Sequence, residues 1–288
     1  MRAEAVFSLK FHAWPLASLI SNTMDQALYP GNYHDYADDE VAMQRELEIG
    51  DGMLENNFID EVFPPNSKSL YFDALNPPKG GIPNDSIKWL SISEGEVLNC
   101  ENPVYFNEDM YSCRIIPGAI GNSYLLNTLA LLSCQPKFIH RLLVSSKFAS
   151  RGLYTFKFYK NGKWRYVHID DFIPCRQSGN VHFLHNYSPN ETFAMLIEKA
   201  YAKLHGCYEA LTNGLMEELL LDLTPGAGVT VLRLDRMPKK TMCDEVWDKM
   251  DKAVSKNSLI GCGRFVPDPM TENPAVRKGI PVGKHFIL

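Results

Sequence analysis

Residues 115–132, IIPGAIGNSYLLNTLALL, contain the segment from which the fold of this chain is best predicted. Within and just beyond it, residues 123–135, SYLLNTLALLSCQ, are apolar on nearly all sides of a helix, which is the pattern of a helix buried inside a domain. Gly118 and Gly121 precede this stretch, as expected of a tight turn that leads into a helix. The sequence therefore predicts a buried helix that begins at residue 123.

Two further elements follow along the chain. Residues 153–170, LYTFKFYKNGKWRYVHID, alternate around Asn161-Gly162, a strong short-range signal for a type I′ hairpin. Residues 193–205, FAMLIEKAYAKLH, place apolar side chains on one stripe at helical spacing, and Gly206 ends the helix. This stripe is interpreted as core, with no part in chemistry.

Composition excludes several classes of protein. The chain has 288 residues, 45% hydrophobic and 22% charged, which is the balance of a folded domain. A formal net charge of −5 provides no field to attract nucleic acid or an anionic membrane. No apolar run approaches the roughly 18 residues that span a bilayer. Lys10, His12 and Trp14 interrupt the apolar N-terminus, so no signal peptide and a cytoplasmic location are predicted.

Seven cysteines are widely spaced, and none forms a Cys-x-x-Cys pair. An odd number without such a pair argues against a zinc site or a redox dithiol. The cysteines are therefore interpreted as reduced thiols in a reducing compartment.

The stretch at 115–132 resembles the nucleophile segment of the calpain family of papain-fold cysteine proteases, in which Gln, Gly, a small residue, Leu, Gly and Asp precede Cys-Trp-Leu-Leu. Other segments resemble family motifs in the family's order: FIDEVFPP, SLYF, FKFYKNGKWRYVHIDDFIP, LIEKAYAKLHGCYEAL, SLIGCG and GKHFIL. The resemblance implies an α+β, papain-like calpain protease core. It places a helical first subdomain at 58–225 and an incomplete β-rich second subdomain at 226–288. Residues 1–57 form an N-terminal extension that matches no family motif, and within it Val41, Met43 and Leu47 indicate a short amphipathic helix.

The resemblance places Ser123 at the position of the nucleophilic cysteine, His285 at the general base and Pro117 at the glutamine that supplies an oxyanion donor. The family's mechanism needs a thiolate, which the helix dipole and the imidazolium stabilise. A serine hydroxyl at the same position stays protonated because its pKa is far higher. Proline has neither a side-chain donor nor a backbone N–H. The degenerate positions are therefore expected to be inactive.

The asparagine that orients the imidazole in the family would lie on a later strand, and no residue before Leu288 provides it. The second subdomain is expected to be incomplete for the same reason, so that the chain is expected to be part of a longer one.

Two alternatives remain open. Ser123 would also be found in a calcium-dependent cysteine endopeptidase that was trapped by an engineered Cys-to-Ser change, and an active serine-type hydrolase would use Ser123 with His285. By the same resemblance, Asn122 stands in place of an aspartate, Tyr124 in place of a tryptophan and Pro117 in place of a glutamine. Changes at several neighbouring positions favour natural degeneration over a single engineered change.

No metal or other cofactor is predicted. A calcium site of the family uses an aspartate and a glutamate, which correspond here to Arg114 and Glu191. A guanidinium repels a divalent cation and would instead pair with Glu191. His182 and His185 lie three residues apart without a neighbouring carboxylate pair, and are interpreted as surface residues.

The predicted function is that of a non-catalytic scaffold or binding protein with protein partners, and with neither nucleic acid nor membrane as a partner. Calpain-like proteins with degenerate triads occur in flagellated protists such as kinetoplastids, and the resemblance implies association with the microtubule cytoskeleton or the flagellar axoneme. Aromatic residues dominate interface energetics, so the N-terminal extension is a candidate docking segment through Trp14, Tyr29, Tyr33 and Tyr36. The alternative for this extension is a flexible tail.

Overall fold

The computed structural model describes residues 31–53, 56–78, 83, 86–97, 102–107, 113–212, 214–225, 227–232 and 242–263, and the strands at 5–11 and 285–287. In the strand at 5–11, at 227–231, at 242, at 262–263 and in the strand at 285–287 it describes the backbone alone. The predicted docking residues Trp14 and Tyr29 lie outside the described residues.

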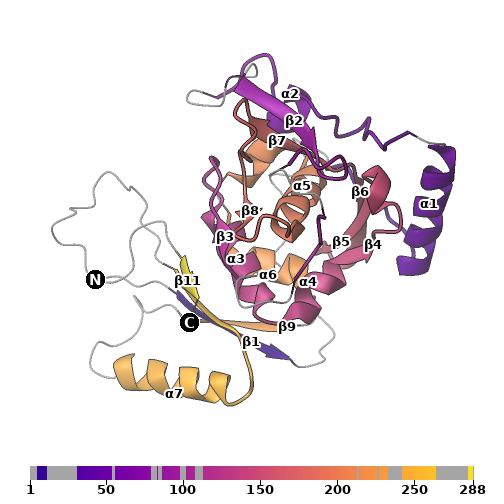
Figure 1. The fold of residues 1–288 in the computed structure, drawn as a ribbon. Coiled ribbons are helices and arrows are strands. Elements are labelled where there is room, and N and C mark those ends of the chain that lie inside the picture. Colours follow the sequence, from indigo (N-terminus) through magenta and orange to yellow (C-terminus); the bar gives the residue numbers. More distant parts are fainter. Residues whose placement is uncertain are drawn as a thin grey trace.

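Four helices form the centre of the main body: α3 (Ser123–Ser133), α4 (Pro136–Leu142), α5 (Phe193–His205) and α6 (Met216–Leu223). The buried helix that begins at residue 123 is confirmed, since Leu125, Leu129 and Leu132 are fully buried. The predicted helix at 193–205 is confirmed with the same bounds. Every residue from Phe193 to Leu204 is buried, so α5 is the central helix of the body (Figure 1).

The predicted hairpin consists of β5 (Tyr154–Lys160) and β6 (Lys163–Ile169), joined at Asn161 and Gly162 with φ of 53° and 77°. Both φ values are positive, as a type I′ turn requires. A third strand, β4 (Leu143–Ser145), pairs with β5. The paired residues alternate between two faces: Phe156 opposite Val167 belongs to the core, and Thr155 opposite His168 belongs to the outer face.

The shorter elements of the body connect and close these layers. They are α2 (Ser67–Leu70), the antiparallel pair β2 (Ile87–Ser91) with β7 (Phe172–Arg176), the pair β3 (Ile115–Ile116) with β8 (His185–Asn186), and the 3₁₀ turns η2 (Ala149–Arg151) and η3 (Tyr208–Leu211).

Part of the N-terminal extension packs on the body. Helix α1 (Asp39–Gly52) lies beside β4 and β5, where Asp38 caps its N-terminus. The predicted apolar side of this helix is wrong, because Val41 and Met43 are 44% and 45% exposed whereas Ala42, Glu46 and Gly50 are buried. A short pattern misled the prediction, since the surface on which α1 packs is mainly polar.

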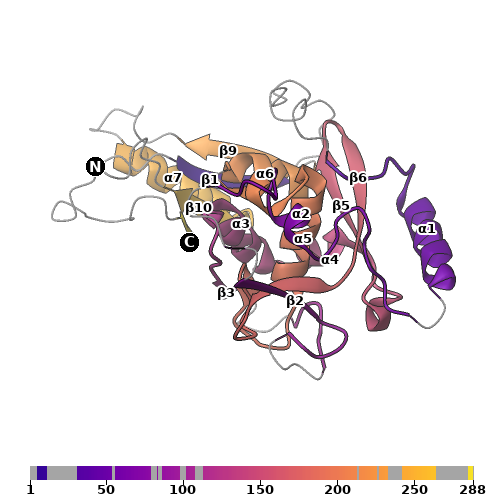
Figure 2. The same ribbon diagram turned by 90° about the horizontal axis from the view of Figure 1, so that it is seen from above.

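The C-terminal sheet has the order β11-β10-β1-β9, with every neighbouring pair antiparallel. Its strands are β9 (Ala227–Leu232), β10 (Ile260–Gly263), β11 (His285–Ile287) and β1 (Ala5–Phe11) from the N-terminal extension. Helix α7 (Met242–Val254) connects β9 to β10, and β1 fills the place between these two parallel strands. The sheet lies between α7 and the helices α3 and α6 (Figures 1 and 2).

Candidate functional site at the start of helix α3

Ser123 is the first residue of α3 and is half-buried. The cap residue Asn122 accepts hydrogen bonds at its carbonyl from the N–H groups of Leu125 (2.9 Å) and Leu126 (3.2 Å). Its side chain does not cap the helix. Ser123 therefore occupies the positive end of a helix dipole, where a thiol would be acidified but an alcohol is not ionised near neutral pH.

The loop before α3 follows strand β3 and begins with the exposed Pro117. Gly118 lies so close to a neighbouring segment of the protein that a Cβ atom on it would be 2.4 Å from the Cα of Phe183. The Ala119 N–H donates to the His182 carbonyl at 3.1 Å. The loop is thus held against residues 182 and 183, and the residue at its start contributes no hydrogen-bond donor.

A buried carboxyl group lies beneath the start of α3, and the sequence interpretation missed it. Glu198 of α5 is 1% exposed and accepts hydrogen bonds from Asn122 Nδ2 at 2.5 Å and from the Leu184 N–H at 2.9 Å. Burial raises the pKa of Glu198 to about 8, although both hydrogen bonds act in the opposite direction. Asn122 therefore gives this carboxyl group a neutral donor. The available signal was the position of Glu198 directly after Leu196 and Ile197 of the apolar stripe.

The second predicted site residue, His285, begins strand β11, and its backbone pairs with Gly263 of β10. β11 packs beside α3. The fold thus brings together the strand that begins at His285 and the helix that begins at Ser123, which are distant in sequence. The His285 side chain is outside the described part of the chain.

Of the two predicted calcium-ligand positions, Glu191 lies just before α5 and Arg114 lies just before β3. Glu191 is fully buried, and its carboxylate accepts from the Asn107 N–H at 2.9 Å and from Asn186 Nδ2 at 3.1 Å. The guanidinium of Arg114 lies over the ring of Tyr187, 4.6 Å from its centroid. Among the described residues no cluster of three or more His, Cys, Asp or Glu side chains is arranged to hold a metal ion.

The two histidines at 182 and 185 differ from the surface residues that were predicted. His182 is 8% exposed, and among the described residues neither of its ring nitrogens has a hydrogen-bond partner. Burial lowers its pKa, so its ring is neutral. His185 is half-buried and its Nδ1 donates to the Phe183 carbonyl at 3.1 Å. The surface assignment is wrong for His182 because residues 180–182 fold back on strand β7.

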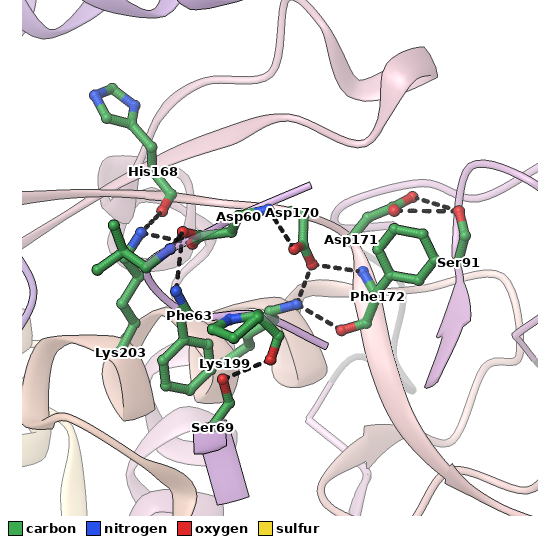
Figure 3. A network of polar contacts seen from close by, with 12 residues as sticks. Asp60, Phe63, Ser69, Ser91, His168, Asp170, Asp171, Phe172, Lys199 and Lys203 are labelled. Atoms are coloured by element: carbon green, nitrogen blue, oxygen red, sulfur yellow. Dashed lines mark hydrogen bonds and ion pairs between the residues drawn. The ribbon is translucent and has the colours of Figure 1, made fainter. Parts of the chain in front are cut away.

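Two buried ion pairs hold the body together around α5 (Figure 3). Lys199 pairs with Asp170, and both side chains are fully buried. One turn later, Lys203 Nζ lies 2.5 Å from Asp60 and donates to the His168 carbonyl at 2.7 Å. The Asp60 N–H donates to Asp170 at 2.8 Å, which joins the pairs into one network. The network fixes the FIDEVFPP segment to the hairpin and to α5.

None of the described cysteine side chains, those of Cys113, Cys134, Cys175, Cys207 and Cys243, forms a disulfide. No helix in the described part of the chain is long and apolar enough to cross a membrane.

Comparison with known proteins identifies the family. The model of the calpain family of cysteine proteases matches residues 58–285, so this chain belongs to the calpain family. The α+β, papain-like calpain protease fold expected from the sequence is confirmed by this match and by the mixed helix and sheet of the structure.

Relatives from plants and animals resemble the chain to a similar degree. It is 32% identical over 211 residues to the calpain-type cysteine protease DEK1 of Zea mays, and the match covers 73% of this chain and 10% of the maize protein. It is 32% identical over 208 residues to calpain-12 of Homo sapiens, covering 71% and 27% of the two chains. Calpain-A of Drosophila melanogaster is 30% identical over 261 residues, covering 90% and 29%. The chain thus spans less than a third of these relatives.

Proposed function

We propose that this member of the calpain family is a non-catalytic scaffold or binding protein. The observation that carries the proposal is the start of α3, where Ser123 and, in the preceding loop, Pro117 occupy the positions that the resemblance assigns to the nucleophile and to the oxyanion donor. A hydroxyl at a helix N-terminus is not a thiolate, and a missing oxyanion donor alone lowers kcat by about 10²- to 10³-fold.

The packing residues around this position are intact while the chemical ones differ. α3 and α5 are buried, the Asn-Gly hairpin forms, and the buried ion pairs are complete. Such a pattern is expected where a protein uses its rigid fold but not its catalytic chemistry. Packing residues are needed for stability, whereas catalytic groups often contribute nothing to it.

The two enzymatic alternatives have direct discriminators. An active serine-type hydrolase would label at Ser123 with a fluorophosphonate probe, and Ser123→Ala would abolish the labelling. A trapped cysteine protease would show a cysteine codon in the native coding sequence. We expect no labelling and a serine codon.

We further propose that calcium is not a ligand of the body. Arg114 stands at a ligand position, and the Glu191 carboxylate is engaged by two neutral donors. A ligand that binds only the native state raises its apparent stability. We therefore expect the Tm measured by differential scanning fluorimetry to be the same with 5 mM EDTA and with millimolar calcium. A clear rise in Tm with calcium would contradict the assignment; magnesium serves as the control.

The partner is proposed to be the microtubule cytoskeleton or the flagellar axoneme, on the basis of the resemblance to degenerate calpain-like proteins of flagellated protists. Two of the predicted docking aromatics have internal contacts: Tyr33 lies under the guanidinium of Arg165, and Tyr36 bonds to His168. The outward residues of α1, Val41 and Met43, are exposed and support a contact made by the extension.

These exposed residues give a sharper test than a deletion of the extension, which would uncover the hairpin. We expect the native protein to sediment with the detergent-insoluble cytoskeleton, and the change Val41→Ser with Met43→Ser to weaken this. Leu75→Ser, at a side chain that is 91% exposed, is the matched control. A fully detergent-soluble native protein would refute the proposed location.

A further inference from the structure

Residues 31–52 cover the outer face of the hairpin with polar contacts. The backbones of His34 and Tyr166 exchange two hydrogen bonds, of 2.8 and 3.0 Å, in the manner of a short added strand. The Tyr166 hydroxyl donates to Asp39 at 2.9 Å, and Asp39 also pairs with Lys157. Asp35 pairs with Arg165 beside them. The segment is thus attached to both strands of the hairpin.

A buried chain of hydrogen bonds links α1 to the hairpin. The Glu46 carboxylate, 1% exposed, accepts from the Ser145 hydroxyl at 2.8 Å and from the Thr155 hydroxyl. Because the Thr155 hydrogen is used there, its oxygen, 2.9 Å from His168 Nδ1, accepts a hydrogen from that nitrogen. His168 Nε2 is then an acceptor and receives the Tyr36 hydroxyl at 3.1 Å. A neutral His168 therefore satisfies every member of the chain.

A proton on His168 would disrupt this arrangement. Its Nε2 would become a donor, so the Tyr36 hydroxyl would have to turn its hydrogen away and accept instead, and a positive charge would enter a buried site. The neighbouring positive groups are Lys203 of α5 and Arg45 of α1. The His34 ring, whose centroid lies 5.3 Å from that of His168, would add a positive charge when protonated. The acidic group in this series of hydrogen bonds is Glu46, which contacts His168 through the Thr155 hydroxyl.

The physical consequence is that docking and protonation oppose each other. Burial, followed by His34 and Lys203, lowers the pKa of His168 to about 3. Burial and the charges of Lys203 and Arg45 also lower the pKa of His34, against a smaller opposing effect of Asp60. Once the segment leaves, the buried ring of His168 faces water and its pKa returns toward about 6.5, while the ring of His34, already exposed in the docked state, moves away from the charge of Lys203.

Few apolar contacts of α1 oppose release, although before it Tyr33 packs against the main core and the Tyr36 ring lies beside that of Tyr166. Ala42 is the buried apolar side chain of α1, and Gly50 lies against the ring of Phe148, where a Cβ would come within 2.4 Å. The docked state thus depends mainly on polar bonds, whose net contribution is about 1 kcal/mol each.

We propose that residues 31–52 are a pH-sensitive latch, docked on the hairpin at neutral pH and released in mildly acid solution when His168 and His34 take up protons. The docked state binds fewer protons than the released state, so docking weakens as the pH falls below about 6.5. Protonation of His168 in the released state is enough to raise the opening constant of the segment by about ten-fold between pH 7.5 and pH 5.5.

The test is amide hydrogen exchange of the whole chain, read by mass spectrometry at pH 7.5 and 5.5 and corrected for intrinsic exchange rates. We expect the opening constant of α1 to rise at least about ten-fold at pH 5.5 while α5 stays protected. The change His34→Gln with His168→Gln should remove this pH response, because Gln provides a donor and an acceptor but does not titrate. His140→Gln, at an exposed histidine of α4, should leave the response intact.

Equal protection of α1 at both pH values would overturn the proposal, and so would a simultaneous loss of protection in α5. If the double variant does not fold, Tyr36→Phe provides the second test at a half-exposed side chain. It removes the donor to His168 Nε2 and should raise the opening constant of α1 several-fold at pH 7.5. Unchanged α1 protection in Tyr36→Phe would also overturn the latch.

Discussion

Replacing Lys199 by methionine is expected to destabilise the main body by about 3–5 kcal/mol. The substitution removes a fully buried cation and leaves the Asp170 carboxylate buried with two backbone donors, the N–H groups of Asp60 and Phe172. It also deprives the Phe172 carbonyl of a donor that lies 2.5 Å away in the native protein. An uncompensated buried charge is among the most costly defects in a protein core.

Urea unfolding at pH 7, followed by far-UV circular dichroism, measures this loss. The double variant Lys199→Met with Asp170→Asn should recover much of the stability, because it removes both charges together. Lys252→Met, at an exposed lysine of α7, is the control and should lie within about 0.5 kcal/mol of the native chain. A Lys199→Met variant within 1 kcal/mol of the native protein would show that the pair does not hold the body together.

The elements predicted well from the sequence are those defined by local signals. The buried helix at Ser123, the helix at 193–205 and the turn at Asn161-Gly162 depend on apolar periodicity and turn chemistry, which a single segment contains. The family motifs extend the prediction to the fold because several unlike segments occur in order.

What could not be predicted depends on contacts between distant segments. No local pattern pairs β1 with β9 and β10, or places Glu198 beneath Asn122. The buried side of α1 was predicted wrongly. Val41, Met43 and Leu47 were expected to form the buried apolar side, whereas the buried Glu46 contacts the hydroxyl groups of Ser145 and Thr155. Buried polar networks are the usual place where rules based on hydrophobicity fail.

Restoring the nucleophile alone is expected to give almost no protease activity. In Ser123→Cys the helix dipole would favour the thiolate form of the new side chain. Pro117 still provides no oxyanion donor, and this loss alone leaves kcat about 10²- to 10³-fold below that of a complete site. The double variant Ser123→Cys with Pro117→Gln should therefore exceed the single variant by about 10²-fold in kcat/KM on a fluorogenic calpain peptide.

Two controls accompany this series. Pro117→Gln in the native Ser123 background should stay inactive, since the donor cannot replace the nucleophile. Melting curves of each variant establish that the fold is unchanged. Calpain-like activity of Ser123→Cys alone would mean that the chain is a trapped protease.

The most direct measurement is an assay of the native protein on casein and on calpain peptides, with EDTA and with millimolar calcium. A non-catalytic chain cleaves neither substrate above the background of Ser123→Ala under either condition. Cleavage by the native protein that Ser123→Ala abolishes would contradict this account.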